Sequence, residues 1–354
     1  MNRQTSQQTA PQGIMPNTQH DRYLPNTLNG AWRGRVLRWE TLLMLFVVLA
    51  FFANTQLSPY FLDPWSLSDA TFNFTEKAII ALPMALLIIA RDIDLSVAST
   101  IALSSVAMGA ANSAGIDTAG MVAIGAGTGL LAGLFNGYII TRFDIPAIVV
   151  TIGTMSLYRG IAYIILGDGV YRDYPPAFAF FGQGYVYGVI SFEFALFLLL
   201  SAVFAVVLHK TTFGRRVFAI GNNPTAALFS GINVKRHRMA LFTLVGFFAG
   251  VAAILLTSRI GSTRPSIAMG WELEVITMVV LGGVSIMGGA GSIAGVFIAV
   301  FLMGLVTFGM GLLNVPGIVM SIFTGMLLIG VIGTPIIWRR ILQAHKIRSK
   351  MKGG

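Results

Sequence analysis

Charged side chains that lie beside apolar segments are the residues of this chain that could do chemistry. The stretch "ALLIIARDIDLSVAST" (85–100) places Arg91, Asp92 and Asp94 within four residues, in a chain of which only 11% is charged. Arg91 and Asp92 suit a short loop between two helices, and Asp94 with Ser96 could cap the start of the next helix. The same carboxylate and hydroxyl could instead line a polar route for a solute. The residues alone leave both interpretations open.

Two further polar positions raise the same question. Trp271, Glu272 and Glu274 begin a later apolar segment, where negative charge suits a helix dipole and could also face a route. Arg159 lies near the middle of the apolar stretch "TIGTMSLYRGIAYIIL", where a charge costs a few kcal/mol unless it meets a partner or water. We therefore expect Arg159 to have a buried partner or to face the route.

Motifs of catalysis and nucleotide binding are missing from the sequence. The glycine-rich stretch "LGGVSIMGGAGSIAG" (281–295) lacks the GxxxxGK[ST] pattern of a phosphate-binding loop, which occurs nowhere in the chain. No HExxH or Ser-His-Asp pattern stands out, and the chain has no cysteine. We predict that the chain is not an enzyme and holds no metal or cofactor of its own.

The composition predicts the elements that position these residues. The chain has 354 residues, is 55% hydrophobic, and repeats apolar stretches long enough to cross a bilayer. We predict an all-α polytopic membrane protein with about ten transmembrane helices; eight or nine remain possible, because the second span is short and carries Pro83. The predicted spans are 41–58, 77–90, 95–113, 118–140, 145–166, 188–208, 239–258, 272–287, 292–313 and 316–337.

The distribution of basic residues predicts the orientation. With a cytoplasmic N-terminus, all but five of the 24 Lys and Arg lie on the cytoplasmic side, as the positive-inside rule requires. The net charge of +10 therefore favours lipid headgroups beside the membrane, not nucleic acid. We expect a disordered cytoplasmic tail over 1–40, a transmembrane domain over 41–338 and a basic cytoplasmic tail over 339–354.

The two halves of the chain resemble each other. "DLSVASTIALSSVAM" (94–108) aligns without gaps to "ELEVITMVVLGGVSI" (272–286), and "IPAIVVTI" (145–152) aligns to "VPGIVMSI" (315–322). Five predicted spans separate the members of each pair, so the copies should cross the membrane in opposite directions. This pattern predicts two inverted repeats with a transport route between them.

The cytoplasmic loop 209–238 is basic at both ends and contains a short predicted helix. Pro224 suits its first turn and Gly231 its end. A basic loop that lies near anionic lipid is the plain interpretation. Basic residues around a nearly neutral helix of small residues favour a docking element for another protein.

The chain resembles the permease subunits of ATP-binding-cassette (ABC) importers for monosaccharides, a family that contains ribose, xylose, rhamnose and autoinducer-2 permeases. The resemblance covers about residues 40 to 337. It rests on "IDLSVAS", "TIGTMSLYRGIAY", "FGRRVFAIGNNPTAALFSGINV" and "SRIGSTRPSIAMGWELEVITMVVLGGVSIMGGAGSIAG".

The resemblance implies a multi-pass protein of the bacterial inner membrane that works with partners. These are a separate ATPase subunit that binds the ATP, a periplasmic sugar-binding protein and a second permease subunit. Residues 222–231 would be the coupling helix that docks on the ATPase. Most relatives carry two glycines at positions 91 and 92, so we expect the charged pair here to bind each other or to face the ATPase.

The expected functional residues fall into two groups. The substrate pathway would contain Asp94, Ser96, Asn136, Thr151, Arg159, Trp271, Glu272 and Glu274. The coupling to the ATPase would use Arg215, Arg216, Asn222, Asn223, Pro224, Ala227 and Gly231.

The leading alternative is a secondary transporter of a small polar solute that is driven by an ion gradient. Such a transporter needs intramembrane carboxylates, and Glu193 is the clear candidate away from the repeat-helix starts. The carried sugar is an expectation from the resemblance, with rhamnose one choice among several.

Overall fold

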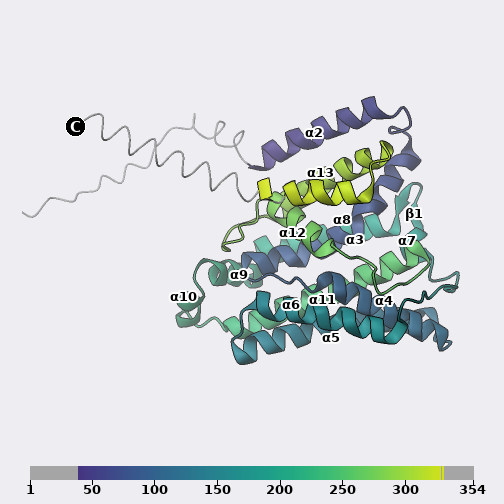
Figure 1. The fold of residues 1–354 in the computed structure, drawn as a ribbon. Coiled ribbons are helices and arrows are strands. Elements are labelled where there is room, and N and C mark those ends of the chain that lie inside the picture. Colours follow the sequence, from purple (N-terminus) through teal and green to yellow (C-terminus); the bar gives the residue numbers. More distant parts are fainter. Residues whose placement is uncertain (1–38, 328, 331–354) are drawn as a thin grey trace, which may run out of the picture. The chain divides into compact units, whose positions relative to one another are not determined.

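The computed structural model describes residues 39–327, 329 and 330, which form a bundle of helices (Figure 1). The predicted tails 1–40 and 339–354 lie outside the described residues, apart from Trp39 and Glu40. These two residues begin the first described helix, α2 (Trp39–Leu57).

Seven helices of the described chain are long and apolar enough to cross a membrane. They are α2, α3 (Pro64–Ile89), α5 (Thr118–Phe143), α6 (Ala147–Leu166), α8 (Phe192–Lys210), α11 (Val234–Ile260) and α13 (Ile293–Leu312). Three other predicted spans contain shorter helices, namely α4 (Val97–Ser113), α12 (Trp271–Leu281) and Gly317–Leu327. The described chain is thus mostly helical with seven candidate membrane spans, and the count of ten crossings stays a prediction.

The remaining elements are short and lie between the long helices. They are α7 (Phe180–Gln183), β1 (Tyr185–Tyr187), β2 (Ile190–Ser191), α9 (Thr212–Asn222) and α10 (Pro224–Phe229). The two strands pair antiparallel as a hairpin.

Helix α3 forms the centre of the bundle and is longer than the predicted span 77–90. Its start is fixed by Asp63, whose carboxylate accepts hydrogen bonds from the backbone N–H groups of Trp65 and Ser66. In the most apolar 18-residue stretch of α3, 83% is buried inside the bundle. The corresponding value for α2 is 11%, because α2 lies along the outside of the bundle (Figure 1). Pro83 is accommodated inside the buried part of α3.

Helices α5 and α11 cross in close contact through glycines at four-residue spacing. Gly129 and Gly133 of α5 face Gly246 and Gly250 of α11. A Cβ atom added at Gly133 would lie 2.9 Å from the Gly246 Cα atom and closer still to the carbonyl oxygen of Phe242. Small residues at this spacing let helix backbones approach within a membrane.

The repeated segments 94–108 and 272–286 run in opposite directions through the bundle. The end of the bundle that carries α9 and α10 is called here the α10 end. Helix α4 begins there, because Asp92 just before it pairs with Arg238 at the start of α11. Helix α12 finishes there, because the loop after it reaches α3, where the Gly289 N–H donates to the Ile89 carbonyl. This antiparallel course is what an inverted repeat requires.

Candidate functional site

A closed polar cluster surrounds Asp94 at the start of α4. The Asp94 carboxylate accepts hydrogen bonds from the Ser96 N–H (2.8 Å) and the Ser96 hydroxyl (2.6 Å). Asn136 of α5 donates to the Ser96 hydroxyl (2.8 Å), and the Tyr158 hydroxyl donates to the Asn136 side-chain oxygen (3.0 Å). All four side chains are buried. Among the described residues no side chain caps the first turn of α4, because Asp94 binds Ser96 itself, and the cluster instead joins α4, α5 and α6.

Arg159 has its partner in a backbone segment. Its guanidinium donates to the carbonyl oxygens of Pro265 (2.6 Å) and Ile267 (2.8 Å), which lie in the connection between α11 and α12. The charge of Glu272 also acts on this guanidinium. Thr151, on the same helix as Arg159, is buried and donates to the Ile148 carbonyl of that helix. The expected partner of Arg159 thus exists, and it holds the segment that leads into α12.

The start of α12 contains an ion pair that the sequence did not reveal. Lys77 of α3 contacts the Glu274 carboxylate at 2.5 Å, and its ammonium lies 4.9 Å from the centre of the Trp271 ring. Glu272 and Glu274 are both only partly exposed.

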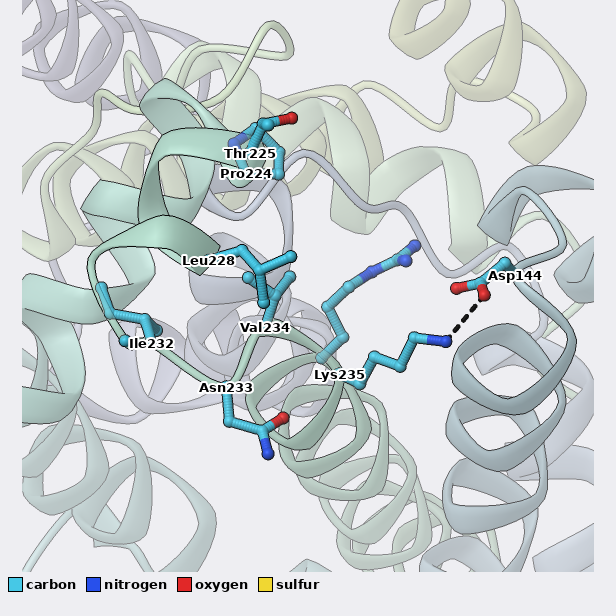
Figure 2. Close-up of a pocket in the computed structure, with 10 residues that line it drawn as sticks. Asp144, Pro224, Thr225, Leu228, Ile232, Asn233, Val234 and Lys235 are labelled. Carbon is cyan, nitrogen blue, oxygen red and sulfur yellow. Dashed lines mark hydrogen bonds and ion pairs between the residues drawn. The ribbon is translucent and has the colours of Figure 1, made fainter.

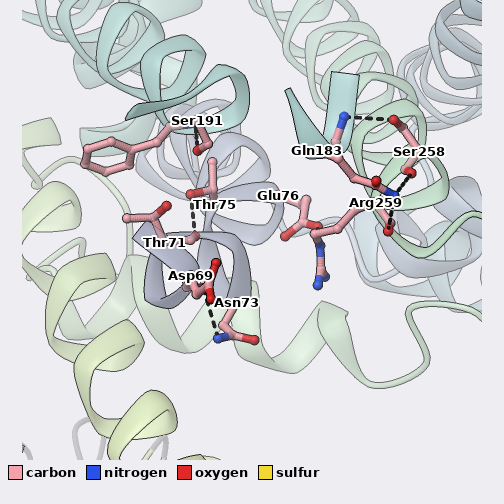
Figure 3. A network of polar contacts seen from close by, with 11 residues as sticks. Asp69, Thr71, Asn73, Thr75, Glu76, Gln183, Ser191, Ser258 and Arg259 are labelled. Carbon is pink, nitrogen blue, oxygen red and sulfur yellow. Dashed lines mark hydrogen bonds and ion pairs between the residues drawn. The ribbon is translucent and has the colours of Figure 1, made fainter. Parts of the chain in front are cut away.

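A second ion pair joins Glu76 of α3 to Arg259 of α11 in the polar network of Figure 3. Arg259 donates to Glu76 at 2.6 Å, and Glu76 is fully buried. Glu193, the carboxylate that an ion-coupled transporter would need, is buried beside it, and its two oxygens have no hydrogen-bond partner among the described residues.

Arg91 and Asp92 do not bind each other. Arg91 donates to the carbonyl oxygens of Met287 (2.8 Å) and Asn222 (3.0 Å), and so joins the end of α3 to the end of α9 and to the loop after α12. Asp92 accepts two hydrogen bonds of 2.6 Å from Arg238 of α11. Arg91 has a φ of 71°, a backbone conformation that favours glycine. Arg91 and Asp92 therefore connect the end of α3 to α9, to α11 and to the loop after α12 at the α10 end.

Helix α10 has the local structure that the sequence predicted. The Asn223 side chain accepts from the Ala226 N–H, Pro224 is the first helical residue, and Gly231 follows the helix with a φ of 81°. A cavity of about 540 Å³ lies beside α10 (Figure 2). The ion pair of Lys235 and Asp144 borders this cavity opposite Leu228.

The exposed apolar surface of α10 differs from the one that the sequence suggested. Ala227 is buried against the rest of the chain, so its side chain faces the permease itself. Leu228 and Phe229 are instead 59% and 86% exposed. Arg215 and Arg216 are exposed on the preceding helix, α9. The surface formed by Leu228, Phe229 and these two arginines is called here the α10 surface.

Comparison with known proteins identifies relatives along most of the chain. Residues 66–332 match the family described as "Branched-chain amino acid transport system / permease component". The Autoinducer 2 import system permease protein LsrD of Escherichia coli (strain K12) is 36% identical over 301 residues, which cover 83% of this chain and 91% of that protein. The protein of the same name from Enterobacter sp. (strain 638) is 34% identical over 303 residues, with 84% and 92% covered. No solved structure matches the chain.

The family match extends from α3 past α13 and therefore includes the Asp94 cluster, the start of α12 and the α10 surface. The identity to the two autoinducer-2 permeases extends over nearly their full length. The chain therefore belongs to the permease family of ABC importers.

Proposed function

We propose that the chain is the membrane-spanning permease subunit of a bacterial ABC importer that carries a small polyhydroxylated solute of the sugar type across the inner membrane. A separate ATPase subunit supplies the energy, a periplasmic binding protein delivers the solute, and a second permease subunit completes the channel. The family and the autoinducer-2 relatives support this proposal. Rhamnose remains one candidate substrate among several.

The observation that carries the proposal is the α10 surface and its attachment. Leu228 and Phe229 present exposed apolar side chains at the basic end of the bundle, as a docking element for another protein would. Arg91 binds the end of α9 directly, and Asp92 binds α11. Arg91 and Asp92 lie between α3 and α4. A movement of a docked ATPase would therefore reach α3, α4 and α11 through these direct contacts.

Such a movement would change two polar sites, one toward each end of the bundle. The Asp94 cluster lies at the start of α4, near the α10 end, and Glu274 lies at the start of α12, toward the opposite end. Alternating access needs sites that open to opposite sides in turn. We propose that the Asp94 cluster closes the cytoplasmic side in this conformation.

The assembly is tested by purifying the tagged chain from its native membrane. We expect it to retain an ATPase subunit, and we expect ATP hydrolysis to disappear when that subunit is removed, because the chain has no phosphate-binding loop. ATP turnover by the chain free of other ATPases would contradict the proposal.

Arg91→Gly should uncouple hydrolysis from transport. Glycine suits the φ of 71°, so we expect the variant to fold with a melting temperature close to that of the wild type. It lacks the two bonds to Met287 and Asn222, and we expect the amount of solute taken up per ATP to fall several-fold.

Arg91→Ala is the matched control for this experiment. It loses the same bonds and keeps the unfavourable backbone conformation, so it should show the same uncoupling with a lower melting temperature. An unchanged ratio of uptake to hydrolysis in both variants would show that Arg91 transmits no movement.

A further inference from the structure

A polar cavity that Glu274 helps to line lies toward the end of the bundle opposite α10. Its volume is about 490 Å³, within the range of roughly 300–1,000 Å³ that is usual for small-molecule sites. Residues of α3, α12, α13 and the helix Gly317–Leu327 line it, and it is open on one side. Its polar lining consists of Asn73, Lys77, Glu274, Thr307, Ser321 and Thr324.

The ion pair in the wall of this cavity is difficult to explain by stability alone. Lys77 and Glu274 are 14% and 21% exposed and lie between apolar helices. An apolar pair of similar volume is often as stable as a buried ion pair. Ionisable side chains inside a membrane bundle therefore point to a bound solute or a transport route.

The other polar side chains of the cavity can form hydrogen bonds with a ligand beside the ion pair. The hydroxyls of Thr307, Ser321 and Thr324 donate to carbonyls of their own helices, which leaves their oxygens able to accept from a ligand. Asn73 lies one turn before Lys77 on α3, at the edge of the polar network drawn in Figure 3. The cavity thus presents donors and acceptors on several sides.

We propose that this cavity is a binding subsite for an uncharged, polyhydroxylated molecule of monosaccharide size, held against the closed ion pair of Lys77 and Glu274. The proposal rests on the proposed function and adds the place and chemistry of binding. The charges of the ion pair cancel, so the site favours a neutral polar ligand. Hydroxyl groups can accept from the Lys77 ammonium and donate to the Glu274 carboxylate while the ion pair stays closed. The charged groups of a zwitterionic amino acid would instead compete with Lys77 and Glu274 for each other's charge.

Protection of a single cysteine tests the subsite. Because the chain has no cysteine, Ser321→Cys supplies one thiol in the cavity. The purified complex is treated with a maleimide in the presence of D-ribose, L-rhamnose, autoinducer-2 or L-leucine. We expect one of the first three to slow labelling several-fold and L-leucine to have no effect. Tyr187→Cys, at a position 81% exposed in the hairpin of β1 and β2 and away from α10, is the control and should be labelled at the same rate under all conditions.

Two outcomes of the labelling overturn the subsite. Protection by L-leucine alone would assign the cavity to an amino acid, and protection by none of the four would remove the subsite. Uptake by the same complex in proteoliposomes separates the two proposals: ATP-driven uptake of a sugar without protection contradicts the subsite alone. Absence of any ATP-driven uptake would contradict the proposed function.

A double variant tests the role of the ion pair. Lys77→Met with Glu274→Gln removes both charges at similar volume and leaves no unpaired charge behind. We expect this variant to elute like the wild type in size-exclusion chromatography and to lose protection of the cysteine at position 321. Full protection in the double variant would show that Lys77 and Glu274 do not hold the ligand.

Discussion

Gly133→Val is expected to destabilise the protein more than any other substitution proposed here, because it forces α5 away from α11. The added side chain would meet backbone atoms of Phe242 and Gly246, which cannot move aside as a flexible side chain can. Overpacking costs about 1–3 kcal/mol and more where nothing yields, so we expect about 3 kcal/mol. The melting temperature of the detergent-solubilised protein measures the effect.

Gly127→Ala is the matched control on the same helix. A Cβ atom at Gly127 meets nothing within 4 Å, and alanine is the better helix former by about 1 kcal/mol. This variant should melt at or above the temperature of the wild type. Equal melting temperatures for the valine and alanine variants would show that the close crossing of α5 and α11 is not needed for stability.

Leu228→Asp combined with Phe229→Asp should abolish transport while the permease remains folded. Both side chains are exposed, so their replacement disturbs no packing inside the chain. If they contact the ATPase, each should contribute about 2 kcal/mol, which is roughly a thirtyfold loss of affinity per residue. Co-purification of the ATPase subunit and uptake measure the effect.

Tyr187→Asp serves as the control for the docking prediction. Tyr187 is 81% exposed in the β-hairpin before α8, at the other end of that helix from α9. It should leave ATPase binding unchanged. Retention of the ATPase by the Leu228 and Phe229 double variant would place the docking surface elsewhere.

Local patterns in the sequence predicted the elements whose signals lie within a few residues. Pro224 and Gly231 predicted the limits of α10, and the apolar stretches predicted the long helices. The start of α3 was placed too late because Asp69, Asn73 and Glu76 interrupt the apolar pattern. In the structure Asp63 caps this helix, and Glu76 is neutralised by Arg259, so the polar segment is helical as well.

Contacts between residues far apart in the sequence could not be predicted. Lys77 and Glu274 are 197 positions apart, and neither is unusual in its own segment. Arg159 binds carbonyl oxygens, which every residue carries and which leave no signal in the sequence. The exposure of Leu228 and Phe229 and the burial of Ala227 depend on how α10 packs against the bundle.

The most direct test of the central claim is uptake into proteoliposomes that contain the permease and its ATPase. With ATP on the cytoplasmic side and the binding protein outside, we predict that a radiolabelled sugar or autoinducer-2 accumulates. We predict that a protonophore and a sodium ionophore leave the rate unchanged. Accumulation that needs an ion gradient and proceeds without nucleotide would contradict the account and would assign the chain, with its buried Glu193, to ion-coupled transport.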